Sequence, residues 1–343
     1  MGTLCFLASW LAAPLKKNTQ QIGRKNQMKL FKYMAILAFA TVAFFTGPAA
    51  AWEPTKPIKI IVGFSPGGGT DIVARTLVAA SQEFFPVPLV VVNKPGAGGT
   101  LAADFVSKAK PDGYTLLVAG GSESTSVPNH RKVNYQIEEF VGVIRLIRSR
   151  IFIAVRADSD IKSIDDLKAK AKANPGKLSY GTSGQGSILH SAMLLLAKDL
   201  DVDLRHIPYK GGAPAMAALL GGHVDITMVG GPEEAQAHLA AGKIRLLALT
   251  SDSRFRGFKD VPTLQEMGVD VYVDNMKGLV APKGTPPEVV TYLHDNFKKG
   301  LDSKVWEKLA AKLKLETGYL SGEDFSAAMQ SMSGSIGKAV KGL

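Results

Sequence analysis

The chain has 343 residues, of which 46% are apolar and 21% are charged, a composition typical of a folded globular protein long enough for two domains. Its formal net charge is +11, but six of the basic residues and none of the acidic ones lie before residue 52. The remaining 35 basic and 30 acidic residues form no dense basic stripe with interleaved aromatic residues. These numbers exclude a disordered chain and argue against a nucleic-acid partner.

The first 51 residues have the features of a secretory signal. Residues 28–32 form a short basic segment, residues 33–45 are apolar and uncharged, and residues 49–51 are three alanines that match a small-x-small cleavage pattern. The apolar segment is too short to span a bilayer as a stable helix, and a retained N-terminal anchor is the alternative interpretation. The pattern predicts a signal peptide and a periplasmic protein.

We expect cleavage after Ala51, so that Trp52 becomes the mature N-terminus and residues 1–51 are the leader. Residues 1–27 precede a complete signal, which suggests that translation starts at Met28. The only cysteine is Cys5, so the expected mature chain has no disulfide, no thiolate metal site and no cysteine nucleophile.

Strands and helices alternate along residues 52–150. Apolar, β-branched runs predict the strands, and longer amphipathic runs predict the helices between them. The predicted strands are 58–64, 89–93 and 115–119, and the predicted helices are 72–85 and 100–108. This alternation is typical of an α/β fold with a mostly parallel sheet.

A second series of the same kind begins after residue 150. Residues 151–157 and a helix at 164–173 connect the two series. The predicted strands that follow are 178–181, 204–207, 225–229 and 246–250, and the predicted helices are 188–200, 213–220 and 235–241. The chain therefore contains two similar α/β segments.

The C-terminal part has one short predicted strand, 278–281, followed by predicted helices at 286–301, 303–313 and 322–340. Because these helices lack a sheet of their own, we expect them to fold back onto the first segment. The expected domains are lobe I from residues 52–150 plus 262–343 and lobe II from residues 151–261. The expected hinge consists of two crossings, near 151–157 and 253–262.

Each lobe has a glycine-rich turn between a strand and a helix, at residues 64–71 and 182–187. Glycines let the backbone approach a ligand closely, and the first turn of a helix offers free N–H groups and partial positive charge to an anion. The alternative is that each is an ordinary capped turn. Residues 120–122 and 230–231 follow other strands and are expected to line the walls. The predicted ligand-binding residues are Phe64, Ser65, Pro66, Gly67, Gly68, Gly69, Thr70, Asp71, Ser122, Thr182, Ser183, Gly184, Gln185, Gly186, Ser187, Gly230 and Gly231.

Competing motifs are incomplete. Neither glycine-rich turn has the third glycine of a dinucleotide fingerprint, and no P-loop or His-Glu-x-x-His motif is present. Residues 63–67 match the G-x-S-x-G elbow of serine hydrolases, but Pro66 follows the serine and has no N–H for the oxyanion hole. We therefore disfavour a serine hydrolase, and we predict no catalytic residue, metal or cofactor.

An ordered set of short motifs resembles a known family. These motifs are PIKIIV at 57–62, PGGGTD at 66–71, NKPGAGG at 93–99, PDGYTL at 111–116, GQGS at 184–187, PYKG at 208–211, LGGHVD at 220–225 and VPTLQEMG at 261–268. Together they are similar to the Bug-type extracytoplasmic receptors of tripartite tricarboxylate transporters. The resemblance covers nearly all of residues 52–343.

The resemblance implies a two-lobed, type II periplasmic-binding-protein (Venus-flytrap) fold that binds a small carboxylate, in part through ordered waters. It also implies delivery of that ligand to the integral-membrane permease subunits of a transporter, by a receptor that we expect to be a monomer. A ligand-sensing module for a membrane sensor kinase is the alternative, because it would use the same fold and cleft. The chain departs from the family pattern over residues 129–150, which are unusually basic. The cations there are expected to form a solvated face, and the alternative is that one of them reaches the cleft and pairs with a carboxylate, with Arg145, Arg148 and Arg150 as the candidates.

Overall fold

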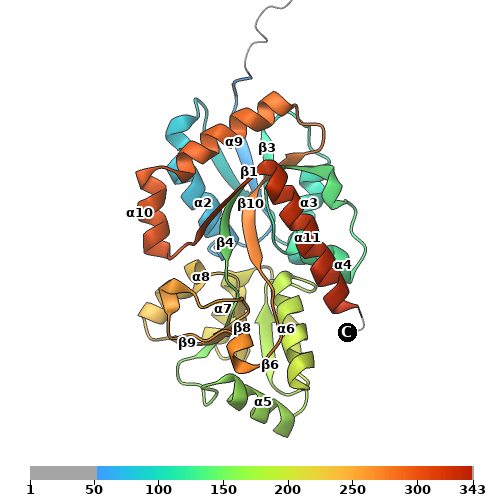
Figure 1. Ribbon diagram of the computed structural model, residues 1–343, viewed down its shortest axis with the longest axis vertical. Coiled ribbons are helices and arrows are strands. Elements are labelled where there is room, and N and C mark those ends of the chain that lie inside the picture. The colour runs from blue at the N-terminus through green and yellow to red at the C-terminus, as the bar shows by residue number, and fades with distance from the viewer. Residues whose placement is uncertain (1–51, 342–343) are drawn as a thin grey trace, which may run out of the picture. The chain divides into compact units, whose positions relative to one another are not determined.

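The computed structural model describes residues 52–341, so the predicted leader and its cleavage site lie outside the described residues. The described part forms two mixed β-sheets with helices packed against them (Figure 1). Here lobe I denotes the six-stranded sheet with its helices, and lobe II denotes the five-stranded sheet with its helices. The predicted α/β class is confirmed.

The sheet of lobe I has the strand order β11-β4-β10-β3-β1-β2. Its strands are β1 (Ile58–Val62), β2 (Leu89–Asn93), β3 (Thr115–Ala119), β4 (Phe140–Ser149), β10 (Asn275–Pro282) and β11 (Thr317–Ser321). β1 runs parallel to both β2 and β3, whereas β10 is antiparallel to β3 and β4. The carboxyl ends of β1 and β3 therefore meet at one edge of the sheet, where ligands bind in open α/β folds.

Helices cover both faces of this sheet because the side chains of β1 alternate between two buried clusters. Ile58 and Ile60 pack with α2, α9 and α10, while Ile61 packs with α3 and α11. The helices of lobe I are α2 (Gly69–Ser81), α3 (Thr100–Ser107), α4 (Val127–His130), α9 (Pro287–Leu301), α10 (Lys304–Leu313) and α11 (Gly322–Val340). A π-helical turn at Ser122–Ser126 leads from β3 into α4.

The sheet of lobe II has the order β7-β6-β8-β5-β9, with β6 parallel to β7 and β8 and β5 antiparallel to β8 and β9. Its strands are β5 (Phe152–Arg156), β6 (Ser179–Thr182), β7 (Arg205–Pro208), β8 (Ile226–Val229) and β9 (Ile244–Leu249). Its helices are α5 (Ile164–Ala173), α6 (Ile188–Leu200), α7 (Gly212–Leu220) and α8 (Pro232–Ala240). α5 and α6 share one buried cluster, and α7 and α8 share the other.

The segment between β9 and β10 packs with lobe II. Leu264, Val269 and Val273 belong to the same buried cluster as Leu167 of α5 and Leu196 of α6. The domain boundaries expected from the sequence stay a prediction, and we propose a shift of the second one. In this proposal the chain returns to lobe I at the start of β10.

Helix α11 packs on both lobes. Phe325 and Met329 in its first half belong to a core cluster of lobe I, whereas Ile336 and Val340 near its end belong to a core cluster of lobe II. The helix predicted at 322–340 is confirmed, and its first half packs against the sheet of lobe I. Its last two turns tie the C-terminal segment to the other lobe.

Candidate functional site

A small cavity lies between the two lobes, at the carboxyl ends of β1, β3 and β8. Its room for solvent is about 30 Å³, enough for roughly two water molecules. The lining comes from both lobes and comprises Phe64, Gly68, Gly69, Thr70, Val118, Ala119, Gly121, Ser122, Glu123, Ser183, Ile188, Leu189, Gly212, Gly230, Glu234, Asn275, Met276 and Lys277. The turns predicted to face each other, 64–71 and 182–187, thus both contribute to one cavity.

The turn of lobe I is shaped by a buried carboxylate. Asp71 accepts hydrogen bonds from the Gly67 N–H (2.9 Å), the Arg75 guanidinium (2.9 Å) and the Asn93 amide (2.9 Å). Burial opposes ionisation of Asp71, but these hydrogen bonds outweigh it and lower its pKa. Asp71 therefore holds the backbone that presents Gly68 and Gly69 to the cavity.

The turn of lobe II is held by local side chains. Ser187 caps α6, because its hydroxyl accepts a hydrogen bond from the His190 N–H (3.2 Å). The Thr182 hydroxyl accepts from the Gly184 N–H (3.3 Å) and contacts Nε2 of His206 (2.7 Å). These contacts fix the geometry of the turn rather than line the cavity.

The two lobes also bond to each other directly beside the cavity. The Ser122 hydroxyl of lobe I accepts from the Ile188 N–H (3.0 Å), and the Ser126 hydroxyl donates to the Gly186 carbonyl (2.8 Å). An ideal Cβ on Gly184 would lie 3.0 Å from the backbone of Gly98. The close approach of the lobes at this point therefore requires glycine.

Seven of the predicted ligand-binding residues line the cavity: Phe64, Gly68, Gly69, Thr70, Ser122, Ser183 and Gly230. Within residues 52–341, the structure places ten others outside the lining: Ser65, Pro66, Gly67, Asp71, Thr182, Gly184, Gln185, Gly186, Ser187 and Gly231. Ser65, the serine of the elbow motif, donates its hydroxyl hydrogen to the carbonyl of Lys210 (3.0 Å). Within this second group, Ser65 and Gly184 contact the opposite lobe, whereas Asp71 and Ser187 shape their own turns.

Four polar residues of the lining were not predicted from the sequence: Glu123, Glu234, Asn275 and Lys277. Glu123 could have been predicted from its position, because it follows Ser122 just after the carboxyl end of β3, where ligands bind in open α/β sheets. Asn275 and Lys277 lie on β10, whose predicted strand began only at residue 278. Glu234 has no local signal, because an acidic residue in the first turn of a helix is ordinarily a solvated partner of the helix dipole.

The cavity is bordered by a buried ion pair. Lys277 contacts Glu233 and also donates to the Ser149 hydroxyl (3.0 Å), and the side chains of both ionic partners are almost fully buried. A buried pair of this kind is costly to break because either partner alone would be an uncompensated charge. Lys277 is thus engaged within the protein and faces the cavity as part of a neutral pair.

Two further carboxyl groups face the cavity without a full ionic partner. Glu123 accepts from the Ser124 hydroxyl (2.9 Å) and the Gly121 N–H (3.3 Å), and burial raises its pKa. Burial likewise raises the pKa of Glu234; the charge of Lys277 opposes this increase. The carboxylate of Glu234 accepts from the Gly69 N–H (2.5 Å) at the start of α2.

The three arginines singled out in the sequence lie near the crossings between the lobes, and the cavity lining of the described residues does not include them. Arg145 donates to the carbonyl of Gly318 (2.5 Å) and contacts the sulfur of Met276 (3.7 Å), a residue of the lining. Arg145 therefore contacts a residue of the lining without lining the cavity itself.

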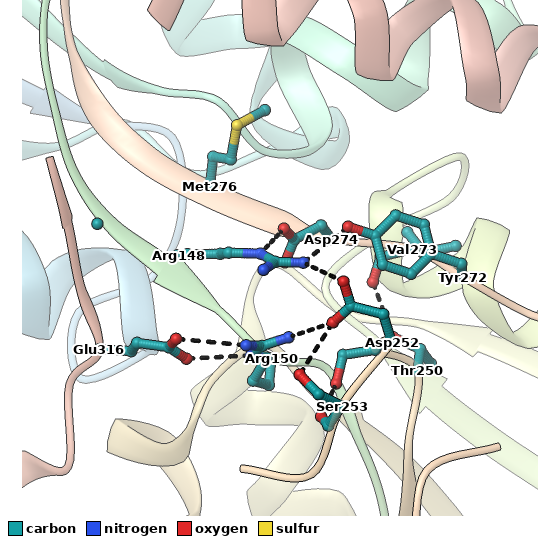
Figure 2. Close-up of polar contacts among 12 residues, drawn as sticks. Arg148, Arg150, Thr250, Asp252, Ser253, Tyr272, Val273, Asp274, Met276 and Glu316 are labelled. Carbon is teal, nitrogen blue, oxygen red and sulfur yellow. Dashed lines mark hydrogen bonds and ion pairs between the residues drawn. The ribbon is translucent and has the colours of Figure 1, made fainter. Parts of the chain in front are cut away.

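Arg148 and Arg150 belong to a charge cluster that we call the hinge network, composed of Arg148, Arg150, Asp252, Asp274 and Glu316 (Figure 2). Arg150 donates to Glu316 (3.0 Å) and Asp252 (3.2 Å), and Arg148 donates to Asp274. The network joins the ends of β4 and β9 to the starts of β10 and β11. It ties together the segments through which the chain passes between the lobes.

The described residues contain no group of three or more His, Cys, Asp or Glu side chains arranged to hold a metal ion. Over residues 52–341, no helix is long and apolar enough to cross a membrane.

Comparison with known proteins gives the relation of this chain to others. The model of the tripartite tricarboxylate transporter family receptor matches residues 73–342. The chain belongs to this receptor family. The members are periplasmic solute-binding receptors, not enzymes, so the chain is a receptor and the hydrolase alternative is rejected.

Relatives and solved structures agree with this assignment. The chain is 39% identical over 88% of its length to a UPF0065 protein in the gbd 5′ region of Cupriavidus necator, and covers 93% of it. It is 33% identical over 83% of its length to protein BugT of Bordetella pertussis, of which it covers 89%. The resemblance to Bug-type receptors is confirmed.

Among solved structures, the periplasmic binding protein BugD superposes with a TM-score of 0.79 at 31% identity, with 84% of this chain and 97% of that chain covered. MatC of Rhodopseudomonas palustris, solved with bound malate, gives 0.78 at 29% identity over 84% of this chain and 99% of its own. A second R. palustris protein, solved with adipate, gives 0.79 at 29% identity over 84% and 97%. These similarities confirm the two-lobed periplasmic-binding-protein fold.

Proposed function

We propose that this receptor binds a small carboxylate in the cavity between the lobes and delivers it to the permease subunits of a tripartite transporter. One observation carries the proposal: the Gly69 N–H of lobe I and the Gly230 N–H of lobe II both donate to one carboxylate in that cavity, that of Glu234. A site that can hold a side-chain carboxylate with donors from both lobes has the chemistry to hold a free one. The malate-bound and adipate-bound relatives support this ligand class.

Donors of the backbone suit such a ligand because they bring partial positive charge without burying a cation. An extra buried cation would carry a desolvation penalty of several kcal/mol. The only lysine in the lining, Lys277, is already paired with Glu233. The ligand's second polar end would then meet the hydroxyls of Thr70, Ser122 and Ser183.

A thermal-shift screen of carboxylates on residues 52–343 tests the proposal. A ligand present at 100 times its dissociation constant adds about 2.7 kcal/mol to stability, which gives a clear rise in Tm. We expect malate, adipate or a related acid to raise Tm and to bind with a stoichiometry of one in calorimetry. If no carboxylate in a broad panel shifts Tm of the folded protein, the proposed ligand class is wrong.

A pair of glycine variants tests where the ligand binds. Gly68 lines the cavity and has ordinary contact distances of 3.5–3.6 Å around an ideal Cβ, so Gly68→Val should fold but fill the site. Gly334 of α11 has nothing within 4 Å of its Cβ position and is a matched control. We expect Gly68→Val to abolish the ligand-induced shift and Gly334→Val to retain it. Equal shifts in both variants would place the ligand elsewhere.

Export and delivery have separate tests. The Trp52 ring packs edge-on against Tyr114 (5.6 Å between ring centroids) and Tyr292 (5.2 Å), which supports residue 52 as the first residue of the folded mature chain. N-terminal sequencing of the periplasmic protein should begin at Trp52. Loss of uptake of the identified acid on deletion of either this gene or the permease genes would establish delivery. Light scattering should give the mass of a monomer.

A further inference from the structure

The carboxylate of Glu234 lies where three elements of both lobes converge. Oε1 accepts from the N–H of Gly69, the first residue of α2 in lobe I, at 2.5 Å. Oε2 accepts from the N–H of Gly230, in the turn that leads from β8 to α8 in lobe II, at 3.1 Å. Glu234 itself is in the first turn of α8. One side chain of lobe II therefore satisfies a free helix-terminal donor of lobe I.

The space around this carboxylate is made by glycines. An ideal Cβ on Gly212, the first residue of α7, would lie 2.4 Å from Oε1 and 2.6 Å from Oε2 of Glu234. An ideal Cβ on Gly69 would lie 2.8 Å from Oε1. A side chain at either position would exclude the carboxylate. We call the space between the Gly69 N–H, the Gly230 N–H and Gly212 the carboxylate seat.

The seat suits any carboxylate and not only that of Glu234. The starts of α2 and α7 contribute partial positive charge from two lobes, and Lys277 contributes a further favourable charge. Burial of Glu234 disfavours its charged form, so holding the ionised side chain in the seat costs desolvation free energy. A ligand would offer the same two oxygens to the same two N–H groups.

The room in the cavity decides whether both carboxylates can be present. With Glu234 in place the cavity has room for roughly two water molecules, so a di- or tricarboxylate cannot bind in this arrangement without a displacement of side chains or an opening of the lobes. The donors are also shared, because each N–H forms one strong hydrogen bond with one acceptor. A ligand carboxylate that binds at the start of α2 must therefore displace Glu234.

We infer that Glu234 is an internal competitor of the ligand: in the free receptor its carboxylate occupies the seat and bridges the lobes, and the ligand's carboxylate binds by replacing it. The inference rests on the proposed function of the cavity. It makes Glu234 a determinant of affinity, because the apparent dissociation constant equals the intrinsic one divided by the fraction of receptor molecules whose seat is empty. An alternative role, in which Glu234 holds a cationic group of the ligand, predicts the opposite effect of removing it.

Rescue by acetate tests the seat without knowledge of the ligand. Glu234→Ala removes Cγ, Cδ and both oxygens, and acetate supplies the same four non-hydrogen atoms. In the full mature chain, we expect acetate to raise Tm of Glu234→Ala by about 3 °C more than it raises Tm of the wild type at equal ionic strength. Glu266→Ala is the matched control, because it removes the same four atoms from an exposed pair with Arg254 and leaves no enclosed seat.

Binding of malate and adipate gives the second readout. Glu234→Ala should bind the acid that the wild type prefers about tenfold more tightly or better. Glu234→Gln should also bind more tightly, because the amide fills the space but presents an N–H₂ group toward one of the two N–H donors. The glutamine variant keeps the test valid if the alanine variant does not fold.

The outcomes separate this inference from the proposed function. Wild-type binding of a carboxylate with weaker or unchanged binding by both variants overturns the role of Glu234 and leaves the function intact. Acetate rescue of Glu234→Ala without wild-type binding of any carboxylate in the panel supports the seat and contradicts the proposed ligand class. Absence of acetate rescue in a folded Glu234→Ala protein overturns the inference.

Discussion

In the two glycine-rich turns, some residues shape the backbone and others face the cavity. Ser187 and Ser183 illustrate the division, since both were predicted to contact a ligand and only Ser183 lines the cavity. Ser187 is fully buried and its hydroxyl caps α6. A serine before a helix has the same sequence signature in both roles, because capping and anion binding use the same helix terminus.

Replacement of Ser187 by alanine should therefore reduce stability rather than affinity. The loss of a cap costs about 1 kcal/mol, and the ligand's dissociation constant should stay within about twofold. Ser163→Ala is the control, because Ser163 caps α5 in the same way through the Asp166 N–H (3.1 Å), on a helix that does not line the cavity. Urea unfolding should show similar losses for the two variants, and a large affinity loss confined to Ser187→Ala would contradict this assignment.

A stack of imidazoles beside the lobe II turn makes stability depend on pH. The rings of His190 and His206 are 4.0 Å apart, and Tyr180 stacks on His206 at 4.9 Å. Burial lowers the pKa of His206 to about 4, and burial followed by the charges of His206 and His130 lowers that of His190 to about 3. Both are below the ordinary value of 6.5, so the folded state binds fewer protons than the unfolded one.

Because the folded state binds fewer protons, the contribution of these two histidines to the free energy of unfolding is fully present above pH 6.5. This contribution is lost as the pH falls toward 4. In His206→Gln, which can still contact Thr182, the free energy of unfolding should fall less between pH 6.5 and pH 4.5. Glu123 and Glu234, whose pKa values are raised, act in the opposite direction but are common to both proteins. If the free energy of unfolding, measured in urea, changes with pH to the same extent in the wild type and in His206→Gln, this role of His206 is refuted.

At the scale of elements, the parallel βα units of both lobes were predictable and the strands that close the lobe I sheet were not. The β1–α2 unit has a strand rich in isoleucine and valine, and both this unit and β6–α6 have a glycine-rich turn followed by an amphipathic helix, all of which are local signals. β4 contains Arg145 and Arg148, which suggested a solvated face. Their charges are accommodated by partners distant in sequence, so no local pattern could indicate the strand.

β11 and the polar lining of the cavity also depend on contacts between residues distant in sequence, so local patterns do not predict them. β11 (Thr317–Ser321) is a short edge strand without an apolar run, and it pairs with β4 only after the chain has returned from lobe II. In the cavity, the glycine-rich backbone was predictable, whereas Glu234 and Lys277 are brought to it by long-range packing. Local sequence thus predicts where the cavity lies but not its charge.

The hinge network leads to a prediction about Arg148. The side chain of Asp274 is only 7% exposed and is paired with Arg148, which is 25% exposed. Arg148→Ala would leave a buried carboxylate without its partner, so we expect a loss of about 2 kcal/mol or more. The matched control is Lys172→Ala, in which the lost pair with Asp201 is exposed and worth about 1 kcal/mol or less. Equal losses in the free energy of unfolding, measured in urea, would show that the Arg148–Asp274 pair stabilises the protein no more than an exposed pair does.

For the whole molecule, the approach of the lobes is limited by backbone contact at Gly98 and Gly184. A Cβ on Gly184 would lie 3.0 Å from both Cα and N of Gly98, which is closer than most such contacts. We expect Gly184→Ala to keep the lobes farther apart and to weaken ligand binding about tenfold, since the donors of the two lobes no longer meet. Gly242→Ala is the control, because Gly242 also has a positive φ (63°) but nothing within 4 Å of its Cβ position.

Spin labels can measure this separation, because the chain has no cysteine after Cys5. Labels at the exposed residues Lys110 of lobe I and Lys172 of lobe II report the distance between lobes. The distance in Gly184→Ala should exceed that in the wild type, and Gly242→Ala should match the wild type. Identical distances in all three proteins would mean that this contact does not limit closure.

Because α11 is anchored in the cores of both lobes, its last turns are a reporter of motion at a site they do not touch. Ile336 and Val340 are buried against lobe II, so any separation of the lobes must loosen these turns and expose their amide hydrogens to solvent. Amide hydrogen exchange at residues 336–340 should therefore be slower in the liganded receptor, while the first half of α11 exchanges at an unchanged rate. The amide hydrogen exchange rate at the end of α11 would in this way report whether a ligand occupies the cavity between the lobes.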